Sequence, residues 1–216
     1  ATLFMSYLPA VFFAVWALLL VESWRAGERP ALPALACGVL AGCSVLCEYT
    51  FALLAVLLGI YAIVQARFAP RAWVFWPGML LPLLPFVAYT VAVFGQPCLP
   101  YQYEMNSDFR EGMARGLMGS TQPRLAVLYL VTLHPFRGLF AHSPFLVLAL
   151  AGMARMMQLR AARGLGTLAI LATSGYLLHN SSYYMWWGGW SFAARHLAPL
   201  VPVLALCLPF AWRRAP

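Results

Sequence analysis

Long apolar runs follow one another along almost the whole chain, with only short polar turns between most of them. Only 9% of the 216 residues are charged, whereas an average soluble domain carries about 25%. A chain of this composition needs an apolar medium around its helices, and the hydrocarbon core of a bilayer supplies one. The sequence therefore predicts an integral membrane protein and excludes an ordinary soluble domain.

Seven apolar segments approach the length that crosses about 30 Å of hydrocarbon. The second and third form one apolar stretch interrupted by Glu48; a straight helix of that length would overshoot the membrane, so we expect a hairpin that turns at 47–50. Three prolines predict kinks in the fourth segment, because each removes a backbone donor. The seven segments are 2–21, 32–46, 51–66, 73–94, 144–157, 166–178 and 197–212.

Two polar stretches, 95–142 and 180–196, separate the later segments. Within the first, the apolar run 124–133 predicts an interfacial helix along the membrane surface. The short-loop arginines concentrate on the opposite side, so the positive-inside rule places both stretches in the periplasm or outside. We expect one transmembrane domain over 1–216: an all-α, polytopic bundle of about seven spans with one large periplasmic loop.

The net charge of +8 does not indicate a nucleic-acid partner, because the arginines sit in short clusters between apolar runs. The chain has five cysteines, an odd number, and no two of them have the CxxC spacing. Neither a disulfide framework nor a zinc site is therefore indicated. We expect no metal and no other cofactor. A divalent cation held by carboxylates of the large loop is the alternative.

Two carboxylates are candidates for chemistry. Glu48 is either the solvated tip of the hairpin or a buried carboxylate that binds an acceptor or a cation, since an ionisable group between apolar segments is costly unless it is interfacial or paired. Asp108 belongs to a cluster of carboxylates and tyrosines at 101–111. That cluster is either a sugar-binding surface, a metal site or a set of solvated loop charges.

The segment His134 to Pro144 reads HPFRGLFAHSP and concentrates polar groups at the start of an apolar run. Arg137 within it has the side chain best suited to grip a phosphate through two parallel hydrogen bonds, and a histidine can donate beside it. The segment therefore predicts a lipid-phosphate site, or alternatively a re-entry turn punctuated by proline and glycine.

The segment 183–196 is rich in aromatic residues and ends in Arg195 and His196. It is either an aromatic belt at the membrane interface or a binding site for an anionic headgroup. Its paired glycines, Gly188 and Gly189, favour the second interpretation, because they allow close backbone approach among bulky rings.

The run WWGGWSFAARHLAPLVP over 186–202 resembles the WWGGWSFGPRYLxPxxP segment of bacterial polytopic glycosyltransferases of the GT-C superfamily, relatives of the protein O-mannosyltransferase and aminoarabinose transferase group. Further pieces resemble that family in the same order along the chain. They are GVLAGCSVLCEYTFALLAVLLGIYAI at 38–63, FGQP at 94–97 and HPFRGLFAHSPFLVLAL at 134–150.

The resemblance implies transfer of a sugar from a polyprenyl-phosphate donor to an acceptor at the outer face of the membrane, with inversion at the anomeric carbon. It implies that Arg195, His196 and Arg137 hold the lipid-linked phosphate. The general base of such enzymes usually lies in a first outer loop, and the earliest residues here resemble the family's middle. We therefore expect this chain to be the C-terminal part, with Glu48 and Asp108 as its only local candidates for a base. The residues expected to stack on the sugar or headgroup are Trp186, Trp187, Trp190 and Tyr184.

The predicted function is a multi-pass, glycosyltransferase-like protein of the bacterial inner membrane, with membrane lipid and the sugar donor as its partners. The alternative is a non-catalytic integral membrane subunit that acts as a scaffold with other membrane subunits in a larger complex. A transporter is disfavoured, because no expected span carries a central charged pair of the kind that lines a substrate path.

Overall fold

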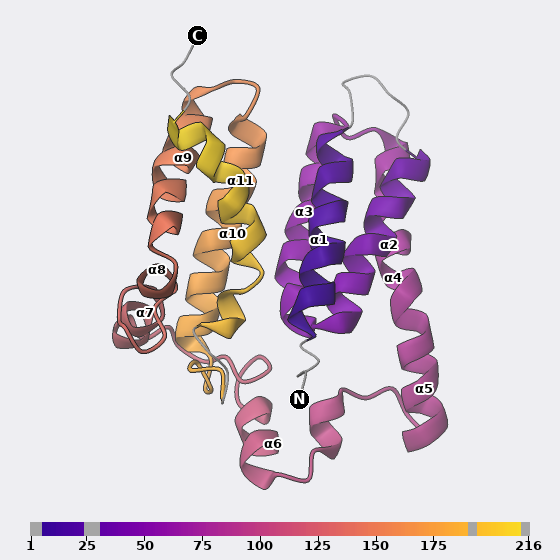
Figure 1. Cartoon of the computed structure of the whole chain (residues 1–216). Coiled ribbons are helices and arrows are strands. Elements are labelled where there is room, and N and C mark those ends of the chain that lie inside the picture. The colour runs from indigo at the N-terminus through magenta and orange to yellow at the C-terminus, as the bar shows by residue number, and fades with distance from the viewer. Residues whose placement is uncertain (1–5, 24–30, 190–193, 213–216) are drawn as a thin grey trace. The chain divides into compact units, whose positions relative to one another are not determined.

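A computed structural model describes residues 6–23, 31–189 and 194–212 (Figure 1). Every regular element in these ranges is a helix, and the β pairing within them is confined to two isolated bridges, Leu117 with Ser120 and Ser120 with Tyr183. The all-α prediction is confirmed. The sequence predicts one transmembrane domain over 1–216, and in the structure the chain folds as two compact units, 1–97 and 98–216.

The first unit is built around α2 (Ala31–Cys47), which packs against α1 (Tyr7–Glu22), α3 (Ala52–Gln65) and α4 (Phe75–Leu80). The hairpin prediction is confirmed, because α2 ends at Cys47 and a short 3-10 turn, η1 (Tyr49–Phe51), leads directly into α3. The loop at 24–30 that joins α1 to α2 lies outside the described residues.

Glycines allow the backbones of α2 and α4 to approach closely. A Cβ atom on Gly38 would collide with the carbonyl oxygen of Phe75, and one on Gly42 would collide with that of Met79. On the other helix, a Cβ on Gly78 would clash with the carbonyl of Leu35. Small residues spaced four apart are the usual means by which helices in an apolar medium gain van der Waals contact.

The run 70–94 is helical almost throughout but changes its winding at the predicted prolines. It comprises η2 (Pro70–Val74), α4, η3 (Leu81–Leu83) and α5 (Leu84–Phe94), and it ends at Gly95 with φ +75°. Proline lacks the donor that an α-helix uses, so tighter 3-10 turns replace the regular pattern near Pro82 and Pro85.

Polar side chains join α1 to neighbouring elements at both of its ends. Ser6 donates to Oε2 of Glu48 at 2.8 Å, and Tyr61 on α3 donates to Oε1 of Glu22. The two bonds fix the register of α1 beside the hairpin. Glu48 therefore lies at the hairpin tip, half-buried and bonded to the start of α1.

The second unit is a group of three helices with shorter elements at one end. α9 (Val147–Gln158), α10 (Arg163–Ser182) and α11 (Leu200–Trp212) pack together, and a Cβ on Gly152 of α9 would collide with the carbonyl of Cys207 on α11. The shorter elements are η4 (Pro100–Tyr103), α6 (Ser107–Ala114), α7 (Leu125–Thr132), α8 (Leu139–His142), η5 (Pro144–Leu146) and η6 (Arg195–Leu197).

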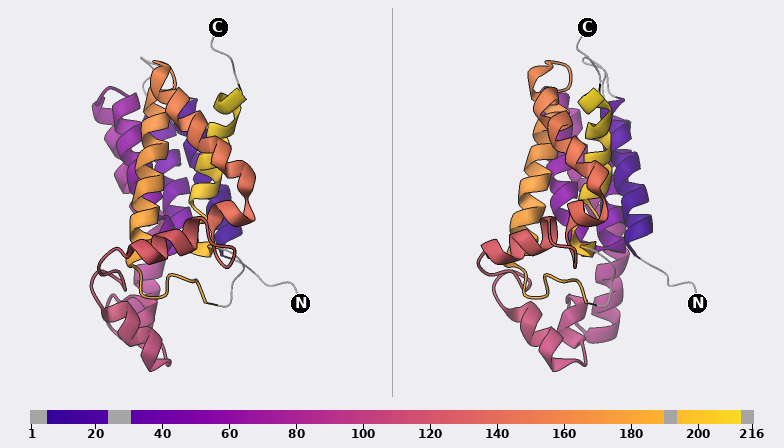
Figure 2. Two further views of the ribbon diagram at one scale, coloured as in Figure 1. Left: turned by 90° about the vertical axis from the view of Figure 1, so that its left-hand side faces the viewer. Right: turned by 60° about the vertical axis from the view of Figure 1, so that its left-hand side comes forward.

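Helix α7 falls where the sequence predicts an interfacial helix. It is seen nearly end-on in Figure 1 and crosses the lower end of the second unit in the left view of Figure 2, so it lies crosswise to α9 and α10. Its residues Leu125 and Tyr129, together with Leu133 just beyond its end, recur every four residues and are exposed. α7 thus presents one apolar face away from α10, against which it packs.

The helix α10 corrects two expected boundaries. It runs for 20 residues from Arg163 to Ser182, whereas the sequence predicts a span of only 166–178 and a loop from 180. Residues 180–182 are therefore helical and buried. The apolar periodicity ends at Leu178, but packing of the polar end of the helix against the rest of the unit extends it by one turn.

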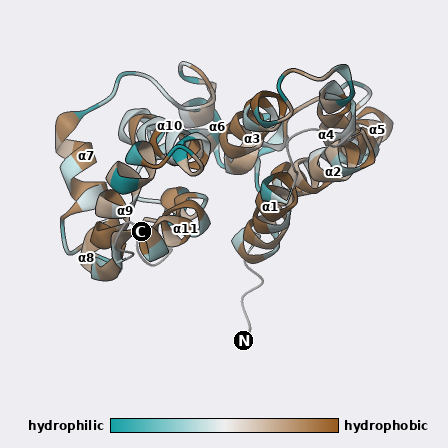
Figure 3. Cartoon of the chain, turned by 90° about the horizontal axis from the view of Figure 1, so that it is seen from above, coloured by the Kyte–Doolittle hydropathy of each residue, from teal (hydrophilic) through white to brown (hydrophobic). Residues whose placement is uncertain are grey.

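By length and composition, one helical run among the described residues, Pro70–Phe94, is long and apolar enough to cross a membrane. Five other expected spans correspond to shorter apolar helices, and the sixth to the longer but more polar α10. Helix length alone therefore supports one span rather than seven. Figure 3 colours most turns of these helices as hydrophobic. Large apolar side chains remain exposed on most of them, among them Leu8, Phe12, Trp16, Ile60, Leu84 and Leu171.

Candidate functional site

The C-terminal end of α10 is the most elaborate polar region of the second unit. The last carbonyls of a helix have no partner within it, and here a loop from before α7 supplies donors. The backbone N–H of Thr121 donates to the carbonyl of Ser182 at 3.0 Å, and that of Arg124 donates to Ser181 at 3.1 Å. The Arg124 guanidinium adds a bond of 3.0 Å to the carbonyl of Tyr183. The residues that follow α10 are thereby fixed against the large loop.

Aromatic rings gather around Tyr183, the first residue after α10. Its ring lies 5.1 Å from that of His196 in an edge-to-face arrangement and 5.7 Å from that of His179. Its hydroxyl donates to the sulfur of Met113 on α6 at 3.0 Å. His179 is held in turn by Ser120, whose Oγ lies 3.0 Å from Nδ1. Elements from three separate parts of the sequence therefore converge on one tyrosine.

The neighbouring Tyr184 packs against α6 and the turn before α7. Its N–H donates to the carbonyl of Gly119 at 2.8 Å, and its hydroxyl donates to that of Phe109 at 3.4 Å. A Cβ on Gly119, where φ is +82°, would meet this ring at 2.7 Å. Glycine at 119 thus allows both the turn and the close approach of the ring. This part of the aromatic segment is fixed by packing and is not an open platform.

His196 is buried, and its environment lowers the pKa of its imidazole from 6.5 to about 4. Burial is the largest cause, followed by the positive charges of Arg195 and His179, while a hydrogen bond with the backbone of Met185 acts in the opposite direction. The imidazole is therefore neutral at pH 7, and at this end of the chain the guanidinium groups carry the positive charge.

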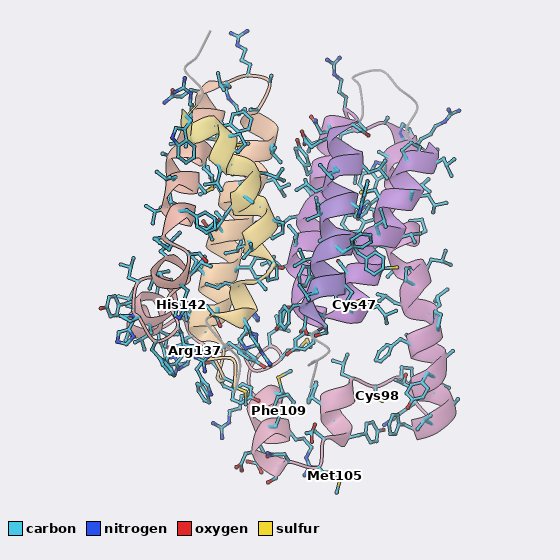
Figure 4. The ribbon with its side chains drawn as sticks, in the orientation of Figure 1. Cys47, Cys98, Met105, Phe109, Arg137 and His142 are labelled. Atoms are coloured by element: carbon cyan, nitrogen blue, oxygen red, sulfur yellow. The ribbon has the colours of Figure 1, made fainter. Side chains whose placement is uncertain are left out.

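Arg137 connects the two segments that the sequence identifies as candidates for phosphate binding. It is only 9% exposed, its Nη2 donates to the carbonyl of Gly189 at 2.9 Å, and its Cζ lies 4.7 Å above the ring of Phe136. Figure 4 shows Arg137 and His142 at the end of the second unit where α8 lies. His142 bonds locally through Nδ1 to the carbonyl of Gly138 at 3.0 Å.

The other predicted site residues differ in exposure. Arg195 is exposed although its neighbour His196 is buried, so only the first of the pair reaches the surface. The rings of Trp186 and Trp187 lie 5.9 Å apart, edge to face, and Trp187 is partly exposed. Trp190 lies outside the described residues.

The two carboxylate candidates lie in different units. Asp108 is exposed in the first turn of α6, and Glu48 accepts the bond from Ser6 in the first unit. Among the described residues, no group of three or more His, Cys, Asp or Glu side chains is placed to hold a metal ion.

Several residues of this region do not emerge from the sequence. His179 and Asn180 fall between the expected span 166–178 and the aromatic segment that begins at Tyr183, and Arg124 lies at the start of an expected interfacial helix. A signal was present, because the polar run HNSS at 179–182 directly follows an apolar stretch and precedes the aromatic segment. The hydrogen bonds that join it to the large loop could not be inferred, since they connect residues about 60 positions apart.

Comparison of the chain with known protein families, with curated proteins and with solved structures finds no match.

Proposed function

We propose that the chain is a multi-pass, glycosyltransferase-like protein of the bacterial inner membrane that takes a polyprenyl-phosphate-linked sugar at the periplasmic face. The observation that carries the proposal is the hydrogen bond from Arg137 to Gly189. It joins HPFRGLFAHSP to the aromatic segment, and these are two of the motifs on which the resemblance to GT-C enzymes rests. Motifs that act on one ligand have to meet in the fold, and these two do.

The proposal assigns the seven apolar segments to membrane spans. The exposed aliphatic and aromatic side chains of α1, α3, α5 and α10 support this assignment, because in water they would cost about 25 cal/mol for each Å² of apolar surface. Helices of 12 to 17 residues are short for a span. Local thinning of the bilayer or additional turns at their ends would accommodate them.

The crosswise helix α7 fits the water–lipid interface in this arrangement. Its exposed face would lie among the acyl chains near the headgroups, beside the C-terminal end of α10, which Trp186 and Trp187 follow in the sequence. The proposed phosphate site would therefore lie at headgroup depth, where the phosphate of a membrane-bound donor also lies.

The proposal gives the two arginines different roles. Arg195 is exposed and would meet the phosphate, where a guanidinium offers two parallel donors and neutralises the charge of the leaving group. Arg137 is buried and would act as a positioning residue that holds the backbone of the aromatic segment. Trp187 would stack on the sugar, while a base would have to come from Asp108, Glu48 or a residue outside this chain.

A second candidate function is a non-catalytic membrane subunit that serves as a scaffold. The bond between Ser6 and Glu48 favours it, because a carboxylate that ties two helix ends together has a packing role. This candidate predicts that the chain purifies with partner subunits in fixed ratio and does not bind the donor phosphate.

Binding of undecaprenyl phosphate to the purified chain in lipid nanodiscs tests the proposal. Arg195→Ala should weaken binding about 10- to 100-fold, because a charge-assisted hydrogen bond contributes about 1.5–3 kcal/mol. Arg195→Lys should retain part of the affinity, since the charge remains but the paired donors are lost. Arg160→Ala is the matched control, because Arg160 is also exposed and lies in the loop between α9 and α10. Equal small effects of Arg195→Ala and Arg160→Ala would reject the assignment.

A further inference from the structure

Two buried polar side chains at the end of α10 lack hydrogen-bond partners. The amide nitrogen and oxygen of Asn180, and Nε2 of His196, have no partner among the described residues. Asn180 is 0% exposed and His196 is 4% exposed, so bulk water does not reach them. Buried polar groups in folded proteins are almost always bonded to protein, to ordered water or to a ligand.

The two side chains lie on elements that pack against each other. His196 is in ring contact with Tyr183 and feels the charge of His179, and these two residues flank Asn180 along the chain. Helix α10 packs against η6, which carries His196. Asn180 lies in the last turn of α10, and Tyr183 is the residue that directly follows the helix. The unpartnered atoms thus lie on two packed elements at one end of the second unit.

Asn180 and His196 together offer both hydrogen-bond donors and hydrogen-bond acceptors. The backbone bond at Met185 favours protonation of the imidazole, so His196 donates its ring N–H to the carbonyl there. Nε2 has no partner and is thus left as an acceptor on a neutral ring. Asn180 offers a donor through its amide nitrogen and an acceptor through its oxygen. The location therefore presents two acceptor atoms and one amide NH₂ group with two donors.

We propose that Asn180 and His196 form a binding site for a neutral hydroxyl group, supplied either by a bound water molecule or by a hydroxyl of a sugar. A hydroxyl donates as well as accepts, so it can satisfy an acceptor and the amide donor together. A phosphate group offers only acceptors when ionised, so it could accept from the amide nitrogen of Asn180 but would leave the two acceptors of the location unpaired. This role differs from the phosphate contact that the sequence predicts for His196, and it does not depend on binding of a polyprenyl phosphate.

Asparagine-selective ¹⁵N labelling tests the proposal directly, because Asn106 and Asn180 are the only asparagines in the chain. The side-chain amide of Asn180, assigned with an Asn180→Asp variant, should show a nuclear Overhauser effect to a long-lived water or hydroxyl proton. Asn106 is exposed and serves as the internal control, with fast exchange only. Adding D-mannose separates the two sources: transfer of the effect to sugar protons identifies a ligand hydroxyl, and an unchanged effect identifies water. Absence of any such effect at Asn180 overturns the proposal.

A stability measurement in detergent gives an independent outcome. Asn180→Leu removes both amide groups at similar size, so a filled site predicts a lower thermal midpoint, by about 4 °C. Ser181→Ala is the matched control, because Ser181 is equally buried but its hydroxyl bonds only to the carbonyl of Leu178. An Asn180→Leu midpoint equal to or above that of the unsubstituted chain means that the amide was unbonded, and it overturns the proposal. Failure of undecaprenyl phosphate binding would leave this result unaffected.

Discussion

Arg137 and Gly189 are joined by a hydrogen bond of 2.9 Å that spans 52 residues of sequence. The donor is a buried guanidinium and the acceptor is a backbone carbonyl in a turn with φ +65°, a conformation that glycine adopts without strain. The bond therefore fixes the backbone of the aromatic segment rather than any one of its rings. The position of Trp186 and Trp187 depends on a residue that lies far away in the sequence.

Removing this bond should loosen the aromatic segment. Arg137→Ala is expected to lower the free energy of unfolding by about 2 kcal/mol, since it deletes a charged donor to a carbonyl. Near-ultraviolet circular dichroism of the tryptophans during thermal unfolding in detergent measures the effect. The thermal midpoint of Arg137→Lys should lie between those of Arg137→Ala and the unsubstituted chain. Arg160→Ala should leave the midpoint unchanged, because Arg160 is exposed. A midpoint of Arg137→Ala that matches Arg160→Ala would show that the bond has no structural role.

The stability of the second unit should fall with acidification. The pKa of His196 is about 4 in the folded chain and about 6.5 when it is unfolded. Below pH 6.5 the unfolded chain therefore binds a proton that the folded chain does not, and stability is lost as the pH falls from 6.5 toward 4. The full loss is about 3 kcal/mol, with no contribution from this group above pH 6.5.

Thermal midpoints between pH 4 and pH 8 check this dependence. His196→Gln should flatten the profile between pH 4 and pH 6.5, because glutamine does not titrate. Two further charged groups face His196, His179 on α10 and Arg195 on the same turn. His179→Gln measures the contribution of the neighbouring imidazole, and Arg195 stays charged throughout the range. A profile that is unchanged by His196→Gln would contradict the assigned burial.

Contact between α2 and α4 should not tolerate a methyl group at position 38. Gly38→Ala normally stabilises a helix by about 0.5–1 kcal/mol, but here the new Cβ would collide with the carbonyl of Phe75. We expect a net loss of thermal stability. Cys43→Ala on the same helix is the control, because that side chain is only half-buried. A gain in stability for Gly38→Ala would mean that the two helices are farther apart.

The proposed topology can be tested with an impermeant thiol reagent in cells, after the five cysteines have been replaced. Met105→Cys should react in intact cells, because Met105 is 96% exposed and belongs to the loop expected in the periplasm. Arg160→Cys should react only after the inner membrane has been permeabilised, because Arg160 is exposed in a loop expected on the cytoplasmic side. The reverse pattern would invert the proposed topology.

Helix positions could largely be predicted from the sequence, because each depends on local information. The turn at 47–50, the proline-interrupted run that ends at Phe94 and the short helix at 125–132 all follow from apolar runs and from residues that break them. The predicted helix end at Leu178 is wrong because it, too, was based on local apolar character. The last turn of α10 is polar, and what extends it is contact with residues 120–124.

For the candidate site as well, the sequence predicts some features and leaves others undetermined. The motifs containing Arg137, Trp187 and Arg195 were visible, because arginine, glycine and clustered aromatic residues are conspicuous in an apolar chain. The difference in burial between Arg195 and His196 could not be predicted, because the two residues are neighbours and only Arg195 is exposed. The polar run at 179–182 does not distinguish Asn180 from its neighbours, and its importance comes from the lack of a partner among the described residues.

The sequence by itself determined the all-helical architecture and the location of the breaks, because hydrophobicity, proline and glycine act within a few residues. Only the tertiary structure decided which arginine is buried, which imidazole is neutral and which polar atoms lack partners. Those properties depend on hydrogen bonds and contacts between segments 50 to 75 residues apart, as in the pairs of Arg137 with Gly189 and of Tyr184 with Phe109. Such pairings follow from packing in three dimensions, which the local pattern of side chains does not record.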